Sequence, residues 1–154
     1  MPLAELLEAY YESHIIFIDP KHATTSENLN NLLDIMDSLP GSTDRLIAKY
    51  YGVTTYWPLW ARERGYKTWG YFYESDSANF ATYEDRWDIL GLNHEASNAT
   101  WTTMLGFGKP VVAHLVATTA HAQTALSNGA AGLMVSGVQQ AIERSSSSIV
   151  DLRR

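Results

Sequence analysis

Short apolar runs alternate with amphipathic stretches along the whole chain, which is the pattern of alternating strands and helices. The strand-like runs are rich in β-branched and aromatic side chains and cover 15–18, 45–51, 67–73, 88–93, 111–116 and 133–135. Apolar residues at helical spacing predict helices over 3–11, 26–38, 54–64, 98–105, 120–127 and 138–144, with a weaker helical or irregular stretch over 79–87. The chain is therefore expected to be an α/β protein.

Residues at the ends of these stretches support the expected boundaries. Pro2 suits a first helical turn, and Ser26 is expected to cap the second helix, which should stop at Leu39-Pro40-Gly41. Gly65 suits the C-terminal end of the helix over 54–64.

Strand and helix in strict alternation build parallel βαβ units with right-handed crossovers. Two architectures compete, an open doubly wound sheet and part of a (β/α)8 barrel. The glycine-rich fingerprints of nucleotide-binding open sheets are missing, so a small flavodoxin-like ligand binder is the weakest alternative. A full barrel needs about 250 residues, so we expect a partial (β/α)8 TIM barrel with about five or six parallel strands and helices outside. It should occupy residues 1–144, followed by a Ser-rich tail over 145–154.

Composition narrows the class of function. The chain has 154 residues, of which 45% are hydrophobic and 18% charged, and a net charge of −6 disfavours a nucleic-acid partner. The absence of cysteine excludes disulfides, thiolate nucleophiles and cysteine zinc sites. No apolar run is long enough to predict a membrane span and no signal peptide is visible, so a cytoplasmic location is the default expectation.

Functional side chains of parallel α/β folds gather at the C-terminal ends of the strands. Asp19 and Lys21 follow the first strand, and their spacing of two places both on one face. A carboxylate suits a hard divalent cation and a lysine suits a phosphate. The alternative is an aspartate that starts a turn before Pro20 and a lysine in solvent.

Four other residues are candidates at the strand ends. Lys49 is unusual in a buried strand, so it is either an inward cation near an anion or a side chain that reaches out to solvent. His94 and Glu95 do not complete an H-E-x-x-H motif, and His94 is either a base at the barrel mouth or a structural histidine. For His114, in the middle of an apolar strand, we favour a core or barrel-lining position. The aromatic run over 50–60 is expected to pack in the core.

The segment Ile15-Ile16-Phe17-Ile18-Asp19-Pro20-Lys21 resembles the strand ending in acid-x-Lys of the glycerophosphodiester phosphodiesterase family, within the phospholipase-C-like phosphodiesterase barrels. The helix before it, the strand over 108–116 and the closing unit over 125–134 are also similar to that family. The resemblance spans nearly the whole chain.

This resemblance implies metal-assisted acid/base hydrolysis of glycerophosphodiesters in lipid metabolism, with Mg²⁺ or Ca²⁺ as cofactor. Asp19 matches a metal ligand and Lys21 the lysine near the substrate phosphate, while Lys49, His94, Glu95 and His114 would bind substrate or shape the mouth. His114 stands where relatives often have tryptophan.

The family's early His-Arg-Gly, Glu-x-Asp and His-Asp motifs have no counterpart before Ile15. The chain therefore resembles the C-terminal part of such a hydrolase, and no catalytic residue is assigned in it. Alone it is expected to be inactive, with its cation bound only in a site completed by the N-terminal half. The alternative is an inactive barrel remnant that acts as a structural or interaction module. In either case a partner chain or self-association is expected to cover the open sheet edges.

Overall fold

The structure is a computed structural model that describes residues 3–21 and 25–136. The helix expected over 138–144 and the tail over 145–154 lie outside these residues.

About five or six parallel strands were expected and six are present in the described residues, each within one residue of the bounds that the sequence pattern predicted. They are β1 (Ile16–Ile18), β2 (Leu46–Tyr51), β3 (Lys67–Phe72), β4 (Ile89–Asn93), β5 (Val111–Val116) and β6 (Gly132–Val135). The long helices are α1 (Leu3–Tyr10), α2 (Ser26–Asp37), α4 (Tyr56–Glu63), α6 (Asn98–Leu105) and α7 (Thr119–Ser127).

The shorter helices differ more from the prediction. The irregular stretch over 79–87 consists of α5 (Phe80–Tyr83) and the 3-10 turn η2 (Glu84–Arg86), preceded by a second 3-10 turn, η1 (Glu74–Asn79). The single-turn helix α3 (Ser42–Arg45) was not expected, since four residues are too few to show a helical period. The residue that caps α2 is Thr25 and not Ser26, because the Thr25 side chain accepts a hydrogen bond from the Asn28 amide.

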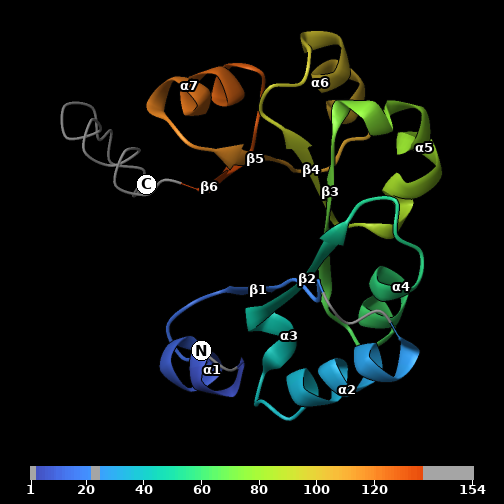
Figure 1. The fold of residues 1–154 in the computed structure, drawn as a ribbon, viewed down its shortest axis with the longest axis vertical. Helices are drawn as coiled ribbons and strands as arrows, with labels where there is room; N and C mark the ends of the chain where they lie inside the picture. The colour runs from blue at the N-terminus through green and yellow to red at the C-terminus, as the bar shows by residue number, and fades with distance from the viewer. Residues whose placement is uncertain (1–2, 22–24, 137–154) are drawn as a thin grey trace.

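All neighbouring strands are parallel, in the order β1-β2-β3-β4-β5-β6. This order follows the sequence without reversing, whereas a doubly wound sheet reverses its strand order at a switch point. The sheet curls into a half-barrel with the helices along its outer side (Figure 1). The open doubly wound alternative is therefore wrong, and within residues 3–21 and 25–136 β1 and β6 are the edges of an unclosed sheet.

The core lies between the outer face of the sheet and the helices. One cluster joins β1 and β2 to α1, α2 and α4, with Leu33, Leu46 and Trp57 completely buried. The other joins β3, β4 and β5 to α5, α6 and α7 around Trp87 and Trp101. Because these clusters use the outward residues of each strand, the inward residues are left to line the half-barrel.

Glycine is required in β3 by a close approach of an aromatic ring. A Cβ atom built at Gly70 would lie 2.4 Å from ring atoms of Trp87, whose indole N–H donates to the Gly52 carbonyl. The hydrogen bond fixes the ring, so no side chain fits at Gly70.

None of the described helices is long and apolar enough to cross a bilayer.

Candidate functional site at the mouth of the half-barrel

The carboxyl ends of β1, β2, β3 and β5 meet at one end of the half-barrel, which we call the mouth. In the parallel register Ile18 is paired with Ala48, so Asp19 follows beside Lys49. Lys49 is paired in turn with Trp69 on β3, and Tyr71 lies two residues further along the same strand. Because side chains two apart share a face, the inward residues of three strands converge at this end.

Asp19 is the centre of a small charge cluster. The Lys49 ammonium lies 2.5 Å from Asp19 Oδ2, and the Lys21 ammonium lies 3.8 Å from the same oxygen. Lys49 is only 8% exposed, whereas the Lys21 side chain is 64% exposed. Around Asp19 two cations face one carboxylate, and the uncompensated positive charge lies on Lys21, which is exposed to solvent.

Aromatic rings help to hold the buried ammonium of Lys49. Its Nζ lies 4.8 Å from the ring centroid of Tyr71 and 5.3 Å from that of Trp69. Lys21 Nζ lies 6.0 Å from the Tyr71 centroid. Attraction of a cation to a ring face is worth about 0.5–2 kcal/mol, most where water is excluded. Tyr71 therefore contacts both lysines.

The structure places His114 at the mouth in a neutral, structural role. It is 2% exposed, and its Nε2 lies 2.7 Å from the Phe72 carbonyl, an acceptor that requires the proton on Nε2. Burial lowers the pKa of His114, and the Lys49 charge lowers it further. A β-bulge follows, with Leu115 at a φ of 60°. The imidazole packs in a T-shaped arrangement against Tyr71 and Tyr73.

The structure does not bring His94 and Glu95 into this cluster. Asn93, not His94, is paired with His114, so the His94 side chain lies on the helix side of the sheet. Its ring stacks on His121 of α7 with centroids 4.2 Å apart, and its Nδ1 lies 3.3 Å from the His114 carbonyl. Glu95 is exposed and lines none of the hollows at the mouth.

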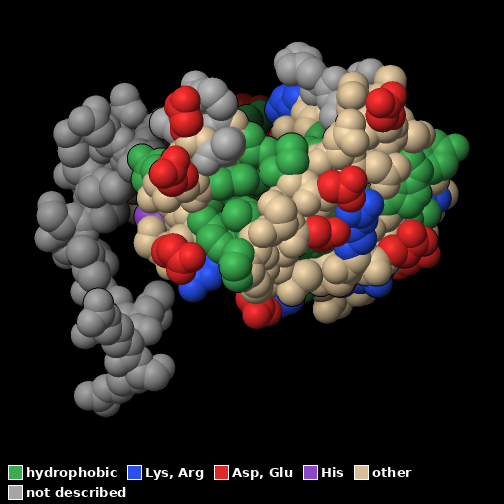
Figure 2. All heavy atoms as spheres, turned by 90° about the horizontal axis from the view of Figure 1, so that it is seen from below, with side chains coloured by type: hydrophobic (Ala, Val, Ile, Leu, Met, Phe, Trp, Pro, Cys, Tyr) green, Lys and Arg blue, Asp and Glu red, His purple; other side chains and the backbone are tan. Residues whose placement is uncertain are grey.

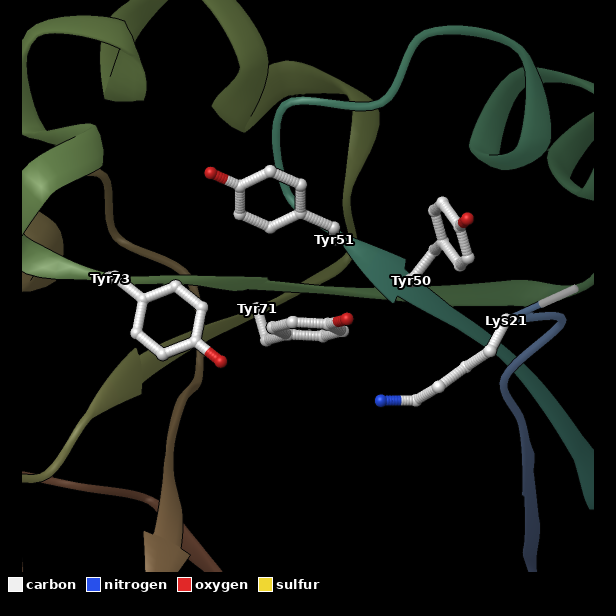
Figure 3. A pocket seen from close by; sticks show the side chains of 5 residues that line it. All are labelled: Lys21, Tyr50, Tyr51, Tyr71 and Tyr73. Atoms are coloured by element: carbon white, nitrogen blue, oxygen red, sulfur yellow. The ribbon is translucent and has the colours of Figure 1, made fainter. Parts of the chain in front are cut away.

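Four tyrosines that the sequence analysis did not single out line a hollow with Lys21, of about 320 Å³. Figure 3 shows this tyrosine pocket, formed by Lys21, Tyr50, Tyr51, Tyr71 and Tyr73. The sequence could have indicated two of the four tyrosines, because Tyr71 and Tyr73 are two residues apart at the end of an expected strand and so share a face. The expectation that the run over 50–60 packs in the core holds for Trp57, but Tyr50 and Tyr51 also line this pocket.

The buried carboxylate of Asp76 lies next to the tyrosine pocket. Tyr51 donates a hydrogen bond of 2.5 Å to Asp76 Oδ1, and the Tyr73 amide donates to Oδ2 of the same residue. The hydrogen bond to Asp76 raises the pKa of Tyr51 to about 12, and burial raises that of Tyr71 to about 12. Both phenols are therefore neutral at physiological pH.

A second hollow, of about 370 Å³, lies inside the curl of the sheet. Phe17, Trp69, Val112 and Met134 form its apolar walls, and the Asp19–Lys49 pair lies at one side. Phe17 is 44% exposed although its ring packs edge-on against Trp69. The interior of the half-barrel is thus charged at the mouth and apolar further inside.

A third hollow lies between α1 and α2, on the face seen in Figure 2. Apolar side chains, including Leu7, Ile35 and Leu39, line it together with Glu8 and Glu12. It has no basic side chain among its lining residues, so it does not suit an anionic ligand.

The described residues do not by themselves fit a Mg²⁺ or Ca²⁺ site. They contain no group of three or more His, Asp or Glu side chains placed to hold a metal ion. At the mouth, Asp19 Oδ2 already faces two ammonium groups within 4 Å. Such cations need several oxygen ligands and are repelled by neighbouring positive charge.

Comparisons with known proteins show similarity at the level of the fold. No protein-family model and no curated protein matches the sequence. The structure is similar to that of a putative glycerophosphoryl diester phosphodiesterase from Agrobacterium tumefaciens, with a TM-score of 0.74, 14% identity and coverage of 93% of this chain and 62% of the other. It is also similar to a chain of the BexX/CysO complex of Amycolatopsis orientalis, with a TM-score of 0.61, 19% identity and coverage of 95% and 66%. This chain therefore spans less than two thirds of either neighbour.

Proposed function

We propose that the mouth of the half-barrel binds the phosphate of a phosphodiester, and that this chain is the C-terminal part of a glycerophosphodiester phosphodiesterase-like hydrolase. The observation that carries the proposal is the exposed ammonium of Lys21, 3.8 Å from a carboxylate that Lys49 already neutralises. An anion at this place meets a net positive charge on the rim of an apolar hollow. The fold similarity to a putative phosphodiesterase points the same way.

The described residues have complementary roles in this proposal. Lys21 contacts the phosphate directly, Lys49 fixes Asp19 so that the carboxylate does not repel the ligand, and Tyr71 holds both ammonium groups. His114 is neutral and its Nε2–H is used by Phe72, so it transfers no proton. We propose that the acid and base of hydrolysis lie outside the described residues of the mouth. We propose the divalent cation only for a completed site, where further oxygen ligands would join Asp19 Oδ1, the carboxylate oxygen that has no hydrogen-bond partner in the described residues.

Binding of a small anion to the purified chain tests the proposal. Titration with dimethyl phosphate and with glycerol phosphate should show saturable binding, weakened about tenfold in Lys21→Met because one charge-assisted hydrogen bond is lost. The matched control is Lys67→Met, since Lys67 is an exposed lysine at the opposite, amino end of β3. Equal affinity in Lys21→Met and Lys67→Met would contradict the proposed phosphate site.

A second candidate function is an inactive interaction module, as the sequence analysis allowed. It is favoured by the open edges at β1 and β6 and by the exposed ring of Phe17 on the inner face. Hydrolysis of glycerophosphocholine by the purified chain with Mg²⁺ or Ca²⁺ separates the candidates. We expect no turnover by the chain alone. Turnover would exclude the module and would place the acid and base within this chain. A stable assembly that closes the sheet edges but neither binds the anions nor hydrolyses the diester would favour the module.

A further inference from the structure

The hollow between α1 and α2 is an apolar groove that the proposed function does not use. It has a volume of about 360 Å³, and its lining includes the apolar side chains of Leu7, Ile35 and Leu39. Leu7 is buried, whereas Ile35 is 47% exposed. A partner that covered the groove would remove this apolar surface from water, which is favourable.

Hydrogen bonds within the chain hold the groove in shape. The Tyr11 phenol donates to the Pro40 carbonyl over 2.5 Å, which ties the end of α1 to the turn after α2. Burial raises the pKa of Tyr11, so the phenol keeps the proton that it donates. Arg45 donates to the carbonyls of Tyr11 and Glu12 and fixes the same end of α1. A partner therefore meets a preformed groove, and little free energy is lost in ordering it.

Two carboxylates give the rim of this groove a negative charge. Glu8 and Glu12 both line it, and their spacing of four places them on one side of α1 and of the turn that continues it. Both are exposed, and among residues 3–21 and 25–136 neither forms an ion pair. Neither α1 nor α2 has a basic residue in its last turn, so the carbonyl ends of both helices add negative potential. Figure 2 shows apolar side chains among acidic groups on this face.

The groove lies at the opposite end of the half-barrel from the mouth. It is formed where α1 and α2 end, and the chain then enters β1 and β2 at their amino ends. The proposed phosphate site lies at the carboxyl ends of the same strands. A partner in the groove would therefore leave the mouth open.

These features favour one kind of occupant. The acidic rim repels anionic ligands and anionic lipid surfaces and attracts positive charge. Hydrophobic grooves bind amphipathic helices, whose apolar side chains enter at spacings of three and four residues. We propose that the α1–α2 groove binds an amphipathic helix of a partner protein, with apolar side chains against Ile35 and Leu39 and lysine or arginine side chains beside Glu8 and Glu12. This inference does not depend on the proposed phosphate site.

The test compares two synthetic peptides of about four helical turns. They have the same leucines at helical spacing and differ only in the residues beside them, which are arginine in one peptide and glutamate in the other. We expect the wild-type chain to bind the arginine peptide about tenfold more tightly, because several exposed charges act together. Equal affinity for the two peptides, or no binding of the arginine peptide at millimolar concentration, overturns the inference.

A charge reversal tests the acidic rim. Glu8→Lys with Glu12→Lys should reverse the preference, so that the glutamate peptide binds more tightly than the arginine peptide. The matched control is Glu63→Lys with Glu95→Lys, which changes the net charge equally at two exposed positions away from the groove. A preference that changes equally in both double variants reflects net charge alone and overturns the inference.

A second variant tests the apolar part of the groove. Ile35→Asn should weaken binding of the arginine peptide about tenfold, because the partner then covers a polar side chain. The matched control is Leu126→Asn, since Leu126 is 53% exposed on α7. Equal effects of the two variants contradict binding in the groove. Titration with dimethyl phosphate should be unchanged in Ile35→Asn, so the outcome for the groove and the outcome for the phosphate site are separate.

Two other occupants would be recognised by their own assays. Light scattering of the chain alone should give the same mass for the wild type and Ile35→Asn. A dimer that dissociates in Ile35→Asn would assign the groove to a second copy of this chain and overturn the inference. Flotation with phosphatidylglycerol vesicles that is lost in Ile35→Asn would assign the groove to a lipid surface and would also overturn it.

Discussion

Removing the Lys49 ammonium tests the charge cluster on which the site depends. In Lys49→Met the aliphatic stem is retained, but the Asp19 carboxylate loses its partner at 2.5 Å. Lys21 is then the remaining cation near Oδ2, at 3.8 Å, and Oδ1 is buried without a hydrogen-bond partner. The variant therefore leaves a poorly compensated charge in a site where the carboxylate side chain is only 15% exposed.

The size of the effect follows from this burial. Breaking a buried ion pair from one side costs about 3–5 kcal/mol. Because the mouth opens to solvent and Lys21 remains nearby, we expect a loss of about 2–3 kcal/mol in the free energy of unfolding. With a urea m-value of about 2 kcal/mol/M for a chain of this size, the unfolding midpoint should fall by about 1–1.5 M.

A double-mutant cycle shows whether this loss comes from the pair. Asp19→Asn with Lys49→Met removes both charges, so the double variant should be more stable than Lys49→Met alone, with a coupling of about 2 kcal/mol. The assay is urea unfolding followed by tryptophan fluorescence. A loss below about 0.5 kcal/mol in Lys49→Met, or simple additivity in the double variant, refutes the ion-pair argument.

Two predictions concern the residues that support the site. Because burial lowers the pKa of His114 below its usual 6.5, the unfolded chain binds a proton that the folded chain does not, so stability should fall as the pH drops below about 6.5. The free energy of unfolding, measured with urea between about pH 7 and about pH 5, should fall less steeply in His114→Gln than in the wild-type chain. An identical dependence on pH in both proteins contradicts a neutral, buried His114. Gly70→Ala should cost about 1–3 kcal/mol and shift the Trp87 emission, because the new Cβ would meet the ring at 2.4 Å. Gly108→Ala is a control without a steric clash, although its φ of 70° adds about 1 kcal/mol of backbone strain. If Gly70→Ala lowers the free energy of unfolding by no more than Gly108→Ala does, the steric argument is wrong.

The sequence predicted the fold well because buried parallel strands are apolar on both faces. Val111–Val116 and Asn98–Leu105 have the bounds that their patterns indicate. The predicted cap of α2, Ser26, is one residue away from the observed cap, Thr25. Both residues are suitable for capping, and only the hydrogen-bond geometry distinguishes them. The partial barrel was expected, because the glycine-rich fingerprints of nucleotide-binding open sheets are missing, and the structure confirms it. The strand order that separates the two architectures is not encoded in the local pattern and comes from the structure alone.

The site was predictable in part. Asp19 and Lys21 were singled out by their spacing of two after a strand, and Lys49 by its unusual place in an apolar run. The tyrosines were missed because an aromatic residue in a strand suits a core as well as a pocket. The sequence left His94 either at the mouth or in a structural position. The β4–β5 register puts Asn93 on the face of His114 and so turns His94 toward α7.

The most direct test of the account is the position at which a phosphate ester perturbs the backbone amide signals of the isotopically labelled chain. The account predicts that dimethyl phosphate shifts the amides of Lys21, Tyr71 and Tyr73 and leaves the opposite end of the sheet, near Lys67, unchanged. Shifts confined to another surface, or none at concentrations that saturate the titration, would contradict a phosphate site at the mouth of the half-barrel.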